Sequence, residues 1–129
     1  MGDAIDRHLD EARQRRASGD VPGAGHALAE AADLARTAGD SRLAYALRHL
    51  CDLQREANLL TESHASAGEA VAVLRAAGPS LDLANALRLR ALAAEALGFD
   101  RAAADWAEAG QLYRALGVAE GVAECEARS

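Results

Sequence analysis

The sequence predicts an all-α protein, a short α-solenoid of three antiparallel helix pairs followed by a closing helix. Half of the residues are hydrophobic but only 3% are aromatic, and alanine, the strongest helix former, supplies most of that apolar content. Apolar side chains recur at helical spacing between short breaks rich in Gly, Asp and Ser. Glycines also recur every 39 residues, at Gly39, Gly78 and Gly117. A period of about 20 to 50 residues with two helices per unit is typical of a solenoid.

Residues 3–17 and 21–38 are expected to form the first helix pair. The break at 18–20 contains Gly19, which suits a left-handed helix end, and Asp20, which can cap the following helix. Gly39 ends the second helix. The expected inward residues of this pair are Ile5, Leu9, Ala12, Ala24, Leu28, Ala31 and either Leu34 or Ala35.

The second pair is expected over 41–57, with Asp40 or Ser41 as its cap, and over a helix ending at Ala77. The intervening turn, 58–61, lacks Gly and Pro, so we expect either a tight bend with Thr61 as the cap or a partly continuous helix. The expected inward residues are Leu43, Leu47, Leu50, Cys51, Ala67, Ala70, Val71 and Leu74.

The third pair is expected over 81–97 and 101–116, after a strong break at 78–80. A closing helix follows at about 118–127. The expected inward residues of these helices are Leu83, Leu87, Ala91, Ala94, Trp106, Ala109, Leu112, Val118, Val122 and Cys125.

Composition limits the classes of function. The chain of 129 residues is expected to be a single domain, 1–129, and its net charge of −6 argues against general nucleic-acid binding. The fourteen basic residues are all arginine. No apolar run approaches the ~18 residues of a membrane span, and the charged N-terminus does not resemble a signal peptide. We therefore expect a soluble cytoplasmic protein that contacts neither membrane nor nucleic acid.

The three units align at many positions. An offset of 39 superimposes small residues that open the second helices, larger residues four positions later, and small residues three positions beyond. These sets are Ala24, Ser63 and Ala102; Leu28 and Trp106; and Ala31, Ala70 and Ala109. On these positions the chain resembles the tetratricopeptide repeat family, and its period of 39–40 is similar to the long variety found in kinesin light chain. The units would be about 3–39, 40–78 and 79–117. Two departures are the turn without Gly and His8, which stands where the other units have leucine.

This resemblance implies a right-handed superhelix whose first helices line a concave groove for a peptide or partner segment. It places the following residues in the groove: Arg13, Arg16, Tyr45, Arg48, Asp52, Arg55, Asn85 and Arg88. The arginines would form a basic strip suited to an acidic or carboxylate-bearing partner. The alternative is mutual neutralisation, through Arg48–Asp52 and Asp52–Arg55 pairs.

The resulting expectation is a non-enzymatic interaction module, an adaptor or scaffold. A regulatory or sensor module that binds a small ligand or signalling peptide is the alternative, and it would need a closed pocket around Tyr45 and Asn85. An enzyme would need convergent titratable groups, for which His49 with Asp52 or Glu56 are the candidates. Apolar residues at the two ends, Ile5 and Leu9 and then Val118 and Val122, could support a homo-oligomer.

Other chemistry-bearing residues have structural interpretations. The histidines lack metal-ligand spacing, and no phosphate-binding loop is present, so we expect no metal or other cofactor. Cys51 is expected in the core, whereas Cys125 is expected to be less buried and able to form an intermolecular disulfide. Trp106 is expected to fill the last unit. The repeated acids Glu30, Glu69 and Glu108 are interpreted as outward-facing solubility residues, because each precedes an arginine by six positions, too far for a pair within one helix.

Overall fold

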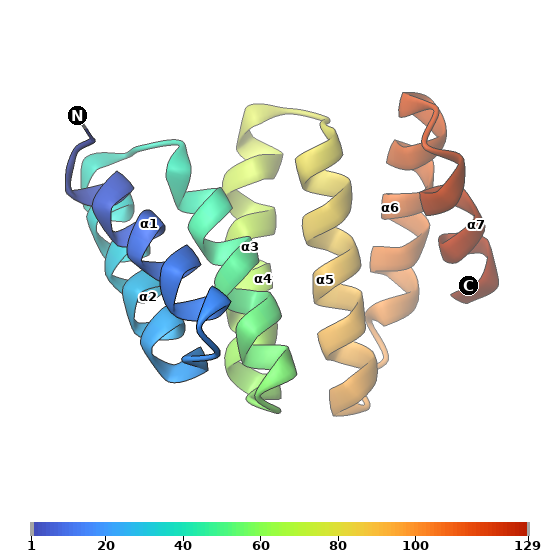
Figure 1. Ribbon diagram of the computed structural model, residues 1–129. Coiled ribbons are helices and arrows are strands. Elements are labelled where there is room, and N and C mark those ends of the chain that lie inside the picture. Colours follow the sequence, from blue (N-terminus) through green and yellow to red (C-terminus); the bar gives the residue numbers. More distant parts are fainter. Residues whose placement is uncertain (1, 129) are drawn as a thin grey trace.

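The computed structural model describes residues 2–128, which form seven helices and no strand. Consecutive helices pack against each other, so the predicted all-α, solenoid-like architecture is confirmed. In Figure 1 the chain advances from α1 and α2 on the left to α7 on the right. The helices are α1 (Ala4–Ala17), α2 (Val21–Ala38), α3 (Arg42–Glu56), α4 (Leu60–Ala77), α5 (Leu81–Leu97), α6 (Ala102–Leu116) and α7 (Ala119–Arg128).

The turns follow from local chemistry, including the turn that lacks glycine. The predicted cap at Asp20 is confirmed, because its carboxylate accepts from the Gly23 amide at 2.9 Å. In the middle turn Asn58 adopts a positive φ of 62°, a conformation that Asn tolerates better than most residues. The helix then begins at Leu60 without a side-chain cap. The prediction that Thr61 caps α4 is wrong, since Thr61 lies inside the first turn.

The core is built from small residues at the predicted positions. Many alanines are fully buried, and Trp106 is 0% exposed, which confirms that it fills the last unit. Small side chains let neighbouring helices approach closely. The choice left open on α2 is settled for Ala35, which is fully buried, while Leu34 is 40% exposed. The sequence did not single out Tyr113, which is buried between α5 and α7.

The repeated acids and arginines meet between units. Arg36 on α2 binds both carboxylate oxygens of Glu69 on α4, at 2.7 and 2.8 Å. One unit later, Arg75 on α4 donates from Nη2 to one carboxylate oxygen of Glu108 on α6, at 2.5 Å. The interpretation of these acids as solubility residues alone is therefore corrected. Glu69 and Glu108 are partly exposed, but the repeat places each beside the arginine of the preceding unit. Glu30, in the first unit, lies beside His8 and His26 instead.

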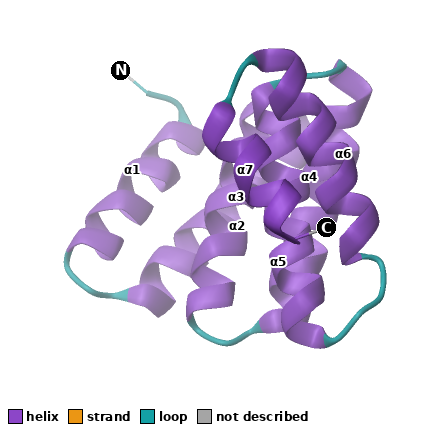
Figure 2. Ribbon diagram, turned by 90° about the vertical axis from the view of Figure 1, so that its right-hand side faces the viewer, coloured by secondary structure: helices purple, strands orange, loops and turns teal. Residues whose placement is uncertain are grey.

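Helix α7 closes the stack by packing on α6, as Figure 2 shows with α7 facing the viewer. Cys125 on α7 lies against Gly110 of α6, where an added Cβ would be 3.1 Å from the Cβ of Cys125. Cys125 is only 3% exposed, so the expectation of a less buried thiol is wrong. At the other end of the stack, Ile5 and Leu9 are 6% and 5% exposed. Both side chains pack within the core.

None of the described helices is both long enough and apolar enough to cross a membrane.

Candidate functional site

A pocket of about 570 Å³ lies between α1 and α3. Leu9, Leu28 and Leu53 form its apolar floor, and each is at most 5% exposed. Because these leucines are held by the surrounding core, the floor is fixed by the fold. Sequence reasoning did not single out Leu53, because it lies beside the apolar stripe of α3 rather than on it.

Four of the eight predicted groove residues line this pocket: Arg13 and Arg16 on α1, and Tyr45 and Asp52 on α3. Tyr45 is 37% exposed, so its ring is available to a ligand. Its ring centroid lies 4.3 Å from that of His49, one turn later, at an interplanar angle of 51°. The two rings form an aromatic wall on the α3 side.

Each charged group of the pocket has a counter-ion. Arg16 donates from Nη2 to Glu56 at 2.7 Å, joining α1 to α3. Arg13 contacts Asp10, and the hydroxyl of Tyr45 followed by the carboxylate of Asp10 raises the pKa of Arg13. On the opposite side Arg55 donates to Asp52 at 2.9 Å, as the neutralisation interpretation predicted.

Burial and nearby charges set the protonation state of His49. Its pKa is lowered, first by burial and then by the positive charge of Arg48, with Arg16 and Arg13 contributing and Asp52 opposing. A histidine with a lowered pKa is neutral at pH 7. The pocket therefore contains an imidazole that is uncharged at pH 7.

The other predicted residues lie outside this pocket. Arg48 donates to Asp82 on α5 at 3.0 Å, and this contact replaces the expected pairing with Asp52. Arg88 contacts Glu124 on α7, and Asn85 accepts from the Tyr113 hydroxyl at 2.6 Å. The predicted strip is therefore divided: Arg13 and Arg16 lie at the α1–α3 pocket, Arg48 and Arg88 join helices, and Arg55 pairs with Asp52 within α3.

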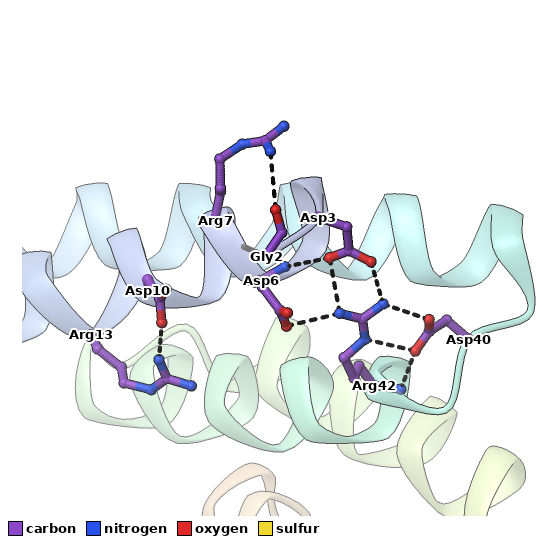
Figure 3. Close-up of polar contacts among 8 residues, drawn as sticks. All are labelled: Gly2, Asp3, Asp6, Arg7, Asp10, Arg13, Asp40 and Arg42. Atoms are coloured by element: carbon purple, nitrogen blue, oxygen red, sulfur yellow. Dashed lines mark hydrogen bonds and ion pairs between the residues drawn. The ribbon is translucent and has the colours of Figure 1, made fainter.

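A cluster around Arg42 joins α1 to α3 at the end of the two helices opposite Arg16 (Figure 3). The guanidinium of Arg42 binds Asp3 at 2.7 and 2.9 Å, Asp6 at 2.8 Å and Asp40 at 2.6 and 2.9 Å. Hydrogen bonds from Arg42 lower the pKa of Asp3 to about 2 and place that of Asp40 well below its usual range. Residue spacing did not indicate this cluster, because its carboxylates lie on two separate segments of the chain.

Other reactive groups are engaged in the fold. Cys51 is fully buried, as predicted, and its carbonyl accepts from the Ser63 hydroxyl at 2.9 Å. Burial raises the pKa of both thiols. Within residues 2–128, no group of three or more His, Cys, Asp and Glu side chains could hold a metal ion.

Comparison with known proteins gives no relative for this chain: no protein-family model, curated protein or solved structure matches it. The site is therefore interpreted from its own geometry.

Proposed function

We propose that this chain is a non-enzymatic interaction module of the tetratricopeptide type, which binds a segment of another protein across α1 and α3. The observation that carries the proposal is the pocket between these helices, which combines an apolar floor with exposed Tyr45. A partly exposed aromatic ring gives a large contact area at a low cost in side-chain entropy, and such rings are enriched in binding surfaces.

Ion pairs at both ends fix the position of α1 relative to α3. Arg42 bridges α1 and α3 near the start of both helices, and the Arg16–Glu56 pair bridges them near their ends. Between these bridges the floor is apolar and the rim is charged. A rigid, preformed surface of this kind loses little freedom on binding, which favours affinity.

The charges of the rim favour an acidic partner segment. The guanidiniums of Arg13 and Arg16 face the pocket, whereas their partners Asp10 and Glu56 are not among its lining residues. An arginine has five N–H donors, so each of these two can donate to a second carboxylate without losing the first. We therefore propose a partner that places an apolar side chain on the leucine floor and a carboxylate at the α1 rim.

Photo-crosslinking tests the proposed function. A photoreactive phenylalanine analogue replaces Tyr45 in one sample and the exposed Ala72 on α4 in a control. Both proteins are irradiated in lysate of the source organism, and crosslinked peptides are identified by mass spectrometry. We expect one defined partner segment from position 45 and not from position 72.

A synthetic peptide covering that segment should then bind the parent protein in calorimetry. Its affinity should fall about tenfold when Leu53 is replaced by Asp, which puts a charge on the floor. Capture of the same partner proteins from positions 45 and 72 would contradict the proposal. Equal affinity of the peptide for the parent protein and for the Leu53→Asp variant would also contradict it.

A further inference from the structure

The pocket between α1 and α3 also has the dimensions of a small-molecule site. Its volume of about 570 Å³ lies inside the range of about 300 to 1,000 Å³ that is usual for ligand pockets. Its lining is mostly apolar, with a few polar groups that converge from two helices. Such pockets bind ligands through an apolar body and fix their orientation through one or two polar groups.

The apolar part of the pocket suits a compact ring or branched group. Leu9, Leu28 and Leu53 provide the floor, and Tyr45 with His49 provides an aromatic wall. Aromatic rings prefer offset-stacked or edge-to-face contacts with such a wall. A flat aromatic body would therefore contact both surfaces at once.

The polar part of the pocket suits a single negative charge. Two guanidiniums and one carboxylate line it, and the carboxylate, Asp52, is already engaged by Arg55 at 2.9 Å. Arg16 uses only Nη2 in its contact with Glu56, and the contact of Arg13 with Asp10 uses Nη1. The N–H groups that are used neither in these contacts nor in the contact of Arg13 with the Tyr45 hydroxyl can form a charge-assisted pair with an incoming anion.

We propose that this pocket binds a small organic acid, in which a carboxylate is attached to an aromatic or branched aliphatic group. The apolar group lies on the leucine floor against Tyr45, and the carboxylate lies between Arg13 and Arg16. The proposal goes beyond the proposed function, because its ligand is a free small molecule, and neither proposal requires the other.

The test compares two probes of nearly the same size and shape, the negatively charged 1-naphthaleneacetic acid and the neutral 1-naphthaleneacetamide. Each is titrated into the ¹⁵N-labelled parent protein, with binding measured by calorimetry and NMR. We expect the acid to bind about tenfold more tightly than the amide, with the largest shifts in α1 and α3. Equal affinities, or shifts concentrated on other helices, would overturn the proposal, and this comparison needs no variant.

A pair of variants then assigns the charge preference. R13Q/R16Q should weaken binding of the acid about tenfold and leave binding of the amide unchanged. The matched control is R75Q/R114Q, which removes two exposed arginines from α4 and α6 and should leave both affinities unchanged. Retention of the acid preference in R13Q/R16Q, or its equal loss in the control, would also overturn the proposal.

The two proposals can fail separately. Failure of the acid to bind leaves a crosslinked partner segment at position 45 unaffected, whereas absence of such a segment does not alter the naphthalene titrations.

Discussion

Replacement of Gly121 by alanine should loosen the closing helix. An added Cβ at this position of α7 would lie 2.4 Å from Cγ of Tyr113 and 2.6 Å from both Cδ atoms of its ring. The ring cannot readily move aside, because it is 3% exposed and its hydroxyl donates to Asn85 at 2.6 Å. The strain must therefore displace α7, visible against α6 in Figure 2.

Two opposing effects set the change in the free energy of unfolding caused by Gly121→Ala. Alanine is more favourable than glycine inside a helix by about 0.8 to 1.0 kcal/mol. Overpacking a well-filled core typically costs about 1 to 3 kcal/mol, and here the added atom would overlap a ring held from its other side. Displacement of α7 also weakens the contact between Glu124 and Arg88 and exposes Cys125. We expect steric strain to dominate, with a net loss of about 1 to 2 kcal/mol in the free energy of unfolding.

Gly68→Ala is the matched control, because an added Cβ at Gly68 on α4 meets no atom within 4 Å. This substitution should stabilise the protein by up to about 1 kcal/mol through helix propensity alone. Urea unfolding, followed by circular dichroism and by Trp106 fluorescence, measures both changes. Equal stabilisation by the two substitutions would refute the assigned packing of α7.

Three further predictions concern charged and reactive groups. The Arg42 guanidinium lowers the pKa of Asp3 from 3.8 to about 2. The stabilisation from this contact is therefore complete above about pH 4 and is lost as the pH falls toward 2. Arg42→Gln should reduce the fall in the urea midpoint of unfolding between pH 5 and pH 3. Arg90 on α5 donates to both carboxylate oxygens of the buried Asp105 on α6, at 2.9 and 2.8 Å. Asp105→Asn should cost about 3 to 5 kcal/mol, because it leaves the largely buried guanidinium of Arg90 without its counter-ion. The apolar pair Arg90→Met/Asp105→Leu should recover most of that loss in the same urea assay. Burial raises the pKa of Cys125. Its reaction with Ellman's reagent at pH 8 should therefore be at least about tenfold slower in the folded protein than in the urea-unfolded protein. Equal rates would contradict the packing of Cys125 against α6.

The repeat was predictable because it depends on residue patterns within short segments of the sequence. Apolar residues at helical spacing and glycines at a fixed period place each helix within a few residues of its observed bounds. The same pattern predicted that Trp106 and Cys51 are core residues. The same pattern placed Cys125 on the inward side of the closing helix, but the depth of its burial was not predictable in this way, because it depends on Gly110 in another helix.

Half of the predicted groove residues line one pocket, and the others do not. Arg48 and Arg88 occupy equivalent places in neighbouring units, yet one pairs with Asp82 and the other with Glu124. Neither partner could be chosen from spacing along a single helix. The contact depends on how far each helix is displaced and rotated relative to the next.

The sequence by itself determined the helices, their number and the identity of most core positions, because these follow from backbone propensity and from apolar periodicity within each segment. It also contained the repeated Glu and Arg positions, but it did not reveal that Glu69 and Glu108 each meet the arginine of the preceding unit. Only the tertiary structure decided the ion-pair partners and placed the pocket between α1 and α3. Those features arise from the relative placement of whole helices, which residue spacing along one helix does not specify.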